Sequence, residues 1–187
     1  LWHRMMAQSG YMIVSIDNRG TPAPRGRAWR KSVYRKIGIV ASEDQASAVR
    51  EIRKWPSVDT SRIGIWGWSF GGYLSTLCLE KGADVFKMAV AVAPVTNWRF
   101  YDSIYTERYN GLPQDNAKGY DENSPNMFTK KMKGKFLLCH GTADDNVHFQ
   151  NSMELVTKLV EANKKFDMAF YPNSNHGIYT GRNTRYH

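Results

Sequence analysis

Residues 62–82 read RIGIWGWSFGGYLSTLCLEKG, and this stretch decides the fold. Arg62 to Trp66 is a short apolar run that predicts a buried strand, and Gly67 to Gly72 predicts a tight glycine-rich turn. Tyr73 to Glu80 continues as a helix, for which Gly82 is a good C-terminal cap. A buried strand that turns directly into a helix is the repeating unit of parallel α/β sheets.

Further apolar runs on both sides of this unit predict the rest of the sheet. Each is short and rich in residues that favour strands; they are Tyr11 to Ile16, Met88 to Ala93, Phe136 to Cys139 and Phe166 to Tyr171. Uniformly apolar strands that alternate with helices predict a mostly parallel sheet with helices on both faces.

The segments between these strands predict several helices and one long loop. Ser42 to Gln45 resembles a capping box, and the helix behind it should stop just before Pro56. Phe149 to Ala162 is an amphipathic helix, and some helix is expected around Tyr101 to Tyr109. Residues 21–40, rich in proline, glycine and arginine, predict a loop.

The turn carries the pattern G-x-S-x-G, formed by Gly67, Ser69 and Gly71. Between a strand and a helix, this pattern is typical of the nucleophile turn of an α/β-hydrolase fold. The turn projects the serine hydroxyl from the sheet edge, and glycine is needed where the chain packs closely. Ser69 is therefore the predicted nucleophile, and the backbone N–H of Phe70 the predicted oxyanion donor.

A serine hydroxyl needs a base, and the chain offers five histidines. His3 and His187 lie near the ends. His140 ends a strand and is expected to be a structural side chain, and His148 lies just beyond the following loop. His176 alone follows the last strand with an acid-bearing loop upstream, in the order nucleophile, acid, base. It is the predicted base.

Two carboxylates can supply the acid. Asp144 and Asp145 both lie in the loop between the strand Phe136 to Cys139 and the next helix. Asp144 comes first after the turn and is preferred, although position alone does not separate the pair. Its role is to hold the imidazole of His176 in the required tautomer.

The net charge of +9 is scattered along the chain without a nucleic-acid motif, so nucleic-acid binding is not expected. Cys78 and Cys139 each lie in an apolar run and are expected to be buried thiols, and no metal or cofactor is expected. No apolar run approaches the roughly 20 residues that span a bilayer. Without an initiator methionine, the chain is expected to be part of a longer protein.

Three segments closely resemble the dipeptidyl peptidase IV family of the prolyl oligopeptidase group of serine peptidases. They are GWSFGGY at 67–73, YDSIYTERY at 101–109 and HGTADDNVHF at 140–149. The resemblance runs from Ile13 to Gly177 and selects Asp144 as the acid. It implies release of an N-terminal dipeptide whose second residue is proline or, less favourably, alanine.

The resemblance also implies a substrate pocket. Five residues would line a slot for proline: Tyr101, Tyr105, Val95, Trp98 and Val147. Asn146 would bind the substrate backbone. An aromatic-walled slot suits a compact apolar ring. Spacing alone leaves another interpretation open, in which Tyr101, Tyr105 and Tyr109 form a helix face packed on the core.

Members of this family have parts that residues 1–187 do not include. The family's N-terminal propeller domain and its second oxyanion donor, a tyrosine, should precede residue 1. Its last helix, which helps to form a homodimer, should follow residue 187. Residues 1–187 would then be a single, partial catalytic domain, truncated at both ends, with weak or absent activity alone. An exported, periplasmic or membrane-associated location fits the resemblance.

Three alternatives to dipeptidyl peptidase activity stay open. The first is the specificity of a prolyl oligopeptidase or an acylaminoacyl peptidase. The second is an esterase. The third is a non-catalytic binding relative, against which the intact Ser69, Asp144 and His176 argue.

Overall fold

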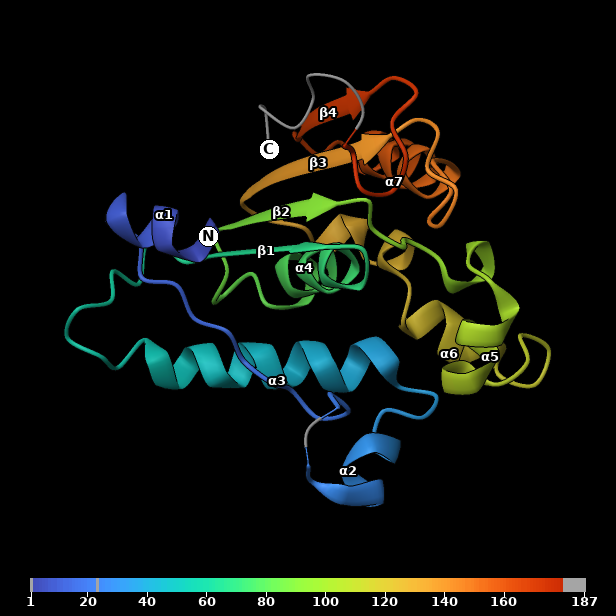
Figure 1. Cartoon of the computed structure of the whole chain (residues 1–187), viewed down its shortest axis with the longest axis horizontal. Coiled ribbons are helices and arrows are strands. Elements are labelled where there is room, and N and C mark those ends of the chain that lie inside the picture. The colour runs from blue at the N-terminus through green and yellow to red at the C-terminus, as the bar shows by residue number, and fades with distance from the viewer. Residues whose placement is uncertain (1, 23, 180–187) are drawn as a thin grey trace.

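The computed structural model describes residues 2–22 and 24–179 and contains a four-stranded parallel sheet (Figure 1). The strands lie side by side in chain order: β1 (Gly64–Trp68), β2 (Met88–Val92), β3 (Lys135–Gly141) and β4 (Asp167–Tyr171). All three neighbouring pairs are parallel. The prediction of a parallel sheet is confirmed, and all four strands coincide with predicted apolar runs within two residues.

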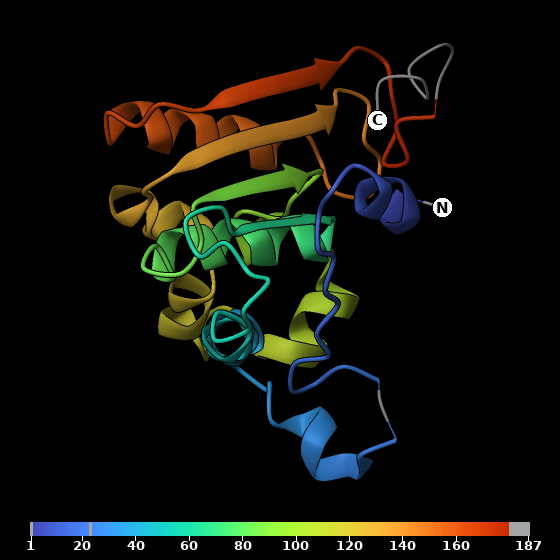
Figure 2. The ribbon, with the colours of Figure 1, turned by 90° about the vertical axis from the view of Figure 1, so that its left-hand side faces the viewer.

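Three long helices enclose the main core together with the sheet. They are α3 (Ile37–Ile52), α4 (Phe70–Lys81) and α7 (Gln150–Glu161). Figure 2 shows the strands above α4 and α4 above α3, in agreement with the contacts of α4 to β1, β2 and α3. The helix α4 ends at Gly82, whose N–H donates to the Cys78 carbonyl, as the sequence predicts.

Shorter helices connect these layers. The α-helices are α1 (Trp2–Gln8), α2 (Gly26–Lys31), α5 (Ser103–Asn110) and α6 (Ala117–Glu122). Three single 3₁₀ turns cover Trp98–Phe100, Pro125–Met127 and Thr129–Lys131. The helix expected around residues 101–109 is therefore present as α5.

The main core lies between the sheet and the long helices. Alternation along each strand directs every second side chain to this face, including Ala89, Ala91 and Leu138. Leu77 of α4 and Leu155 of α7 pack against them and are fully buried. Each such leucine stabilises the fold by about 1.5–3 kcal/mol relative to an exposed position.

The other face of the sheet is apolar but only partly covered. Trp66, Trp68 and Val90 point this way. Trp2 of α1 meets Trp66 with ring centroids 5.8 Å apart, so helices contact both faces, and Ile178 is buried against this face. Trp66 nevertheless stays 44% exposed.

Three sequence predictions in the N-terminal third are wrong, and the first is a strand. Residues 11–16 form no strand, and Tyr11 and Val14 are exposed. A strand needs a neighbour for its backbone hydrogen bonds, and here the Ile16 carbonyl accepts from the side chain of Gln45 instead. Apolar composition alone therefore does not make this segment a strand.

The second error concerns where the following helix begins. The helix α3 starts at Ile37, so Ser42 lies inside it and donates to the Ile39 carbonyl rather than capping an end. The predicted loop of residues 21–40 contains α2 and the first turn of α3. The capping pattern misleads here because serine also bonds to backbone carbonyls within a helix.

Both cysteines are free and buried, as predicted. Burial raises the pKa of the Cys78 thiol to about 12. Among residues 2–22 and 24–179, no helix is long and apolar enough to cross a membrane. The same ranges hold no cluster of three histidine, cysteine, aspartate or glutamate side chains suited to a metal.

Glu80 is a buried carboxyl group in α4. It is 2% exposed, and neither side-chain oxygen has a hydrogen-bond partner among the described residues. Burial raises its pKa well above the ordinary value, although the charge of Lys81 opposes this. Such a raised pKa lowers the stability of the fold as the pH rises above the ordinary glutamate pKa, because only the unfolded chain releases the proton freely.

Replacing Glu80 with methionine, which is similar in length, is expected to raise the free energy of unfolding by about 1–3 kcal/mol near neutral pH. The gain should be smaller at pH 5 than at pH 8. Urea unfolding of the natural full-length protein at both values measures it. The exposed Glu43→Gln on α3 is the control, and an equal gain at both pH values would contradict the explanation.

Candidate active site

Ser69 occupies a sharp turn between β1 and α4. Its backbone has φ 57° and ψ −118°, a conformation that side-chain-bearing residues rarely adopt. The Ser69 N–H donates to the Val92 carbonyl at 2.8 Å, and the Ser69 carbonyl accepts from the Tyr73 N–H at 3.0 Å. These bonds hold the turn in the strained form that the G-x-S-x-G pattern predicts.

The glycines of the turn are needed for close packing. A Cβ on Gly67 would meet the backbone of Gly71 closer than atoms can approach. A Cβ on Gly72 would lie 2.7 Å from the Val92 carbonyl oxygen. Phe70 is the first residue of α4, where backbone N–H groups lack partners within the helix. The Phe70 N–H therefore lies next to Ser69 and has no hydrogen-bond partner within the helix.

Asp144 and His176 meet at the carboxyl ends of neighbouring strands. Asp144 follows β3 and His176 follows β4, and the two residues are joined by a hydrogen bond of 2.7 Å between His176 Nδ1 and Asp144 Oδ2. The His176 side chain is 24% exposed, whereas the Asp144 side chain is fully buried. One end of the imidazole is thus fixed inside the protein while the ring reaches the surface.

The Asp144 carboxylate accepts four hydrogen bonds. Oδ1 accepts from the backbone N–H groups of Asn146 and Val147, both at 2.9 Å. Oδ2 accepts from His176 and from His140, the latter at 3.0 Å. Burial alone would raise the pKa of Asp144, but the bonds from His140, His176 and the Asn146 backbone hold it well below the ordinary value. The group is a carboxylate at neutral pH.

A tryptophan joins the loop of His176 to the nucleophile turn. Trp68, which directly precedes Ser69, donates from Nε1 to the His176 carbonyl at 3.0 Å. Its ring also stacks on Tyr179, with centroids 6.5 Å apart. No hydrogen bond between the Ser69 and His176 side chains is present among the described residues. The Trp68 bond therefore joins the loop of His176 to the nucleophile turn.

Replacing Trp68 with phenylalanine is expected to slow covalent labelling of Ser69 by a fluorophosphonate about 5- to 10-fold, because one hydrogen bond of about 1 kcal/mol that positions His176 is lost. Trp66→Phe is the matched control, since Trp66 lies on the same face of β1 and contacts Trp2 instead. Equal labelling rates for the two variants would contradict this role of Trp68.

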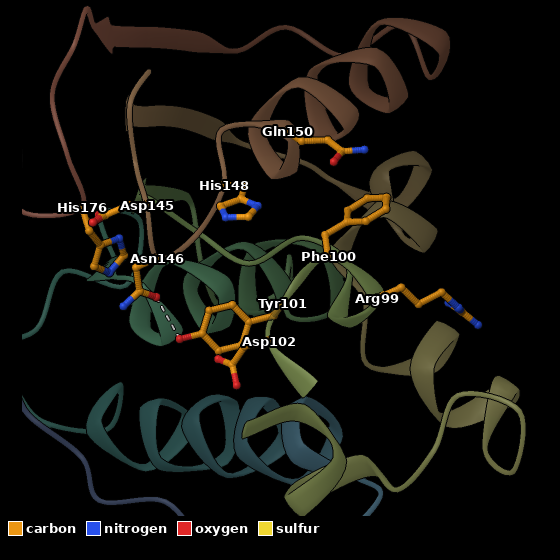
Figure 3. Close-up of a pocket in the computed structure, with 9 residues that line it drawn as sticks. All are labelled: Arg99, Phe100, Tyr101, Asp102, Asp145, Asn146, His148, Gln150 and His176. Carbon is orange, nitrogen blue, oxygen red and sulfur yellow. Dashed lines mark hydrogen bonds between the residues drawn. The ribbon is translucent and has the colours of Figure 1, made fainter. Parts of the chain in front are cut away.

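A cavity of about 720 Å³ opens beside His176 (Figure 3). His176, Asn146 and Asp145 lie towards one end, and Phe100, Arg99 and Gln150 towards the other. The full lining consists of Arg99, Phe100, Tyr101, Asp102, Asp145, Asn146, His148, Gln150 and His176. The Tyr101 hydroxyl donates to Asn146 Oδ1 at 2.9 Å across this space.

Tyr101, which lines the cavity, is the outermost of several packed aromatic rings. Tyr101 meets Tyr105 edge to face, with ring centroids 5.4 Å apart, and Tyr105 stacks on Trp98 at 5.8 Å. Burial raises the pKa of Tyr105 to about 12, so the hydroxyl stays neutral. Tyr105 and Tyr109 share a face of α5, but Tyr101 precedes that helix. The three tyrosines therefore do not form a single helix face, although all three pack against the main core, as the other interpretation expects.

The residues predicted for the pocket divide into two groups. Tyr101 and Asn146 line the cavity, and Tyr105 packs directly behind Tyr101. Three others are at most 2% exposed and lie in the core beneath: Val95, Trp98 and Val147. They can shape the cavity only through the side chains above them.

Sequence reasoning missed several residues of this site. Four lining side chains were not singled out: Arg99, Phe100, Asp102 and Gln150. His140 is fully buried with both ring nitrogens bonded, as expected of a structural side chain, but the sequence does not show that one of these bonds goes to Asp144. Its spacing of four residues from Asp144 is a weak signal, because strand and loop geometry decides whether such a pair meets.

Known proteins resemble this chain along nearly its whole length. A family model described as "Prolyl oligopeptidase family" matches residues 3–187. A protein of Arthroderma otae named "Probable dipeptidyl-aminopeptidase B" is 47% identical over 173 residues, which cover 91% of this chain and 19% of the relative. "Prolyl endopeptidase FAP" of Mus musculus is 44% identical over 181 residues, covering 95% and 24%.

A solved structure gives the same result for the fold. Dipeptidyl peptidase 4 of Porphyromonas gingivalis superposes with a TM-score of 0.96 and 46% sequence identity, covering 99% of this chain and 26% of that protein. The chain thus spans about a fifth to a quarter of the length of these proteins.

Proposed function

The chain belongs to the prolyl oligopeptidase family, and we propose on that basis that it carries the catalytic residues of a serine-type dipeptidyl peptidase. Its α/β-hydrolase fold is that of a dipeptidyl peptidase 4. The observation that carries the proposal is the 2.7 Å bond between His176 and Asp144, on a loop that Trp68 joins to the strained turn of Ser69.

The roles of the three side chains follow from their chemistry. The Ser69 hydroxyl attacks the carbonyl carbon of the scissile bond while His176 Nε2 removes its proton. The protonated His176 then donates this proton to the departing amine, which leaves an acyl-enzyme that water hydrolyses by the same steps. Asp144 keeps the proton of the neutral imidazole on Nδ1 and stabilises the charged form. The Phe70 N–H stabilises the oxyanion.

We further propose that the cavity beside His176 accepts proline at the second position of the peptide. Tyr101 offers an aromatic surface to the cavity, with Tyr105 packed behind it and Val95, Trp98 and Val147 in the core beneath. The amide of Asn146 would bind the substrate backbone beside the scissile bond. The names of the relatives support such a substrate, since they include dipeptidyl aminopeptidases.

Features of the whole protein stay predictions. Residues 1–187 would act as one partial catalytic domain beside an N-terminal propeller, and the intact protein would form a homodimer. The greater length of the relatives agrees with additional domains. The predicted exported, periplasmic or membrane-associated location also stays a prediction.

One relative favours a second specificity. "Prolyl endopeptidase FAP" is named for cleavage within peptides rather than at their N-terminus. The cavity is open and lined by exposed polar side chains such as Asp102 and Gln150, so its lining alone does not select between the two substrate types. The two specificities differ in whether the substrate needs a free amino group, so a test compares a free with a blocked N-terminus.

The test uses the natural full-length protein with two matched substrates, a Gly-Pro amide with a free N-terminus and the same amide with an acetylated N-terminus. Dipeptidyl peptidase activity predicts hydrolysis of the free form and little of the blocked form. Preference for the blocked form would favour the endopeptidase. A protein that hydrolyses neither substrate and does not react with a fluorophosphonate at Ser69 would contradict the proposal of a serine peptidase.

A further inference from the structure

His140 is a second imidazole on the Asp144 carboxylate, at the end of β3. It is 0% exposed, and both ring nitrogens have partners. Nε2 lies 3.0 Å from Asp144 Oδ2 and 2.9 Å from the Val147 carbonyl oxygen. Nδ1 lies 2.6 Å from the hydroxyl oxygen of Ser152 in α7. The ring thus connects α7 to the acid of the proposed triad.

The partners of His140 fix which nitrogen carries the proton. A carboxylate oxygen and a carbonyl oxygen can only accept, so Nε2 must donate to both Asp144 and Val147. The hydroxyl of Ser152 can donate, so it satisfies the lone pair of Nδ1. A neutral ring protonated on Nε2 therefore uses every polar atom of this buried group, with no second charge placed in the core.

The direction of these bonds determines what His140 does to Asp144. Two backbone N–H groups hold Oδ1, which leaves Oδ2 to face His176. The bond from His140 to the same oxygen stops the carboxylate from turning about its last torsion angle. It also takes up part of the negative charge that His176 would otherwise receive.

We propose that His140, held in one tautomer by Asp144 and the Val147 carbonyl and held in place by Ser152, is a positioning residue that fixes Oδ2 of Asp144 on His176 and moderates how strongly the carboxylate stabilises protonated His176. This inference rests on the proposed function, since it assigns a role within the same triad. It adds a fourth side chain, and a fifth from α7, to the residues on which the reaction depends.

His140→Met tests the proposal, because methionine fills similar space without a hydrogen-bond donor. In the natural full-length protein, kcat for the Gly-Pro amide is expected to fall about 10- to 100-fold, with KM unchanged, because a small displacement of a catalytic group has an effect of that size. The acid limb of the pH profile of kcat/KM should move to higher pH, since Asp144 then holds the proton of His176 more strongly.

Other charged groups face His176 and stay constant in this comparison. Asp145 and Asp102 contribute negative charge, and Arg99 and His148 lie further along the cavity. On its buried side, His176 bonds to Asp144, and Asp144 bonds to His140. Among the described residues, these are the two titratable groups in that chain of hydrogen bonds. A displaced limb in His140→Met therefore reports the loss of the bond to Asp144.

Two further variants separate positioning from a merely structural role. His140→Gln offers an N–H donor at similar reach and should restore much of kcat and the wild-type pH profile. Ser152→Ala removes the hydroxyl that bonds Nδ1 and holds the ring in place, and should also lower kcat, by a smaller factor. Thr157→Ala on the same helix is its control, because that hydroxyl bonds only to the Met153 carbonyl among the described residues.

The results can overturn the inference separately from the function. A folded His140→Met with the kcat and pH profile of the wild type would overturn it, as would a His140→Gln no better than His140→Met. If His140→Met does not fold, a Ser152→Ala as active as Thr157→Ala would overturn it. A wild-type protein that neither cleaves the amide nor reacts at Ser69 would instead overturn the proposed function.

Discussion

Ser69→Ala is expected to lower kcat for a Gly-Pro amide by about 10⁴- to 10⁶-fold, because the variant has no oxygen with which to form the acyl-enzyme. Binding is expected to change little, since the methyl group of alanine fits the turn without displacing Gly67 or Gly72. The remaining rate would come from the oxyanion donor and from binding alone. Initial rates of amide hydrolysis by the natural full-length protein measure the effect.

The control for this variant is Ser61→Ala. Ser61 is exposed just before β1 and bonds to Asp59, far along the strand from the turn. Its replacement should leave kcat within twofold of the wild type. A Ser69→Ala variant that keeps a tenth of the wild-type kcat would show that the nucleophile lies elsewhere.

Asp144→Asn is expected to lower kcat by about 10⁴-fold, the size of effect known for this change in another serine protease. The structure gives the reason. Each carboxylate oxygen accepts two hydrogen bonds. The two donors at Oδ1 are backbone N–H groups, which can only donate, so an oxygen must stay at that position. An asparagine must therefore direct its NH₂ group at His140 and His176, and the second of these would be held in the wrong tautomer.

Asp145→Asn is the matched control, since it is the neighbouring residue and is exposed at the rim of the cavity. The sequence alone left these two aspartates open, so the pair tests the assignment directly. Amide hydrolysis across pH 5–9 measures both variants. Comparable losses of kcat in the two would refute the choice of Asp144 as the acid.

The local patterns of the sequence predicted the elements that depend on neighbouring residues. The strand, turn and helix of residues 64–81 follow from an apolar run, two closely packed glycines and a helix-forming segment. The order of nucleophile, acid and base identified His176 and the loop of Asp144 and Asp145, the family resemblance selected Asp144, and the structure joins Asp144 to His176. The boundary of α3 was missed because Ser42 can bond to the backbone within a helix as well as at its end.

The sequence by itself determined the parallel sheet and the serine at its edge, because strand pattern and turn chemistry act over a few residues. Only the tertiary structure decided which distant groups meet. It left residues 11–16 without a strand partner, buried Trp98 beneath Tyr105, and brought His140 and Ser152 to the far side of Asp144. Most of these contacts join segments that are far apart in the sequence, so no local pattern contains them. The pair His140 and Asp144 is close in sequence, but only the strand and loop geometry brings it together.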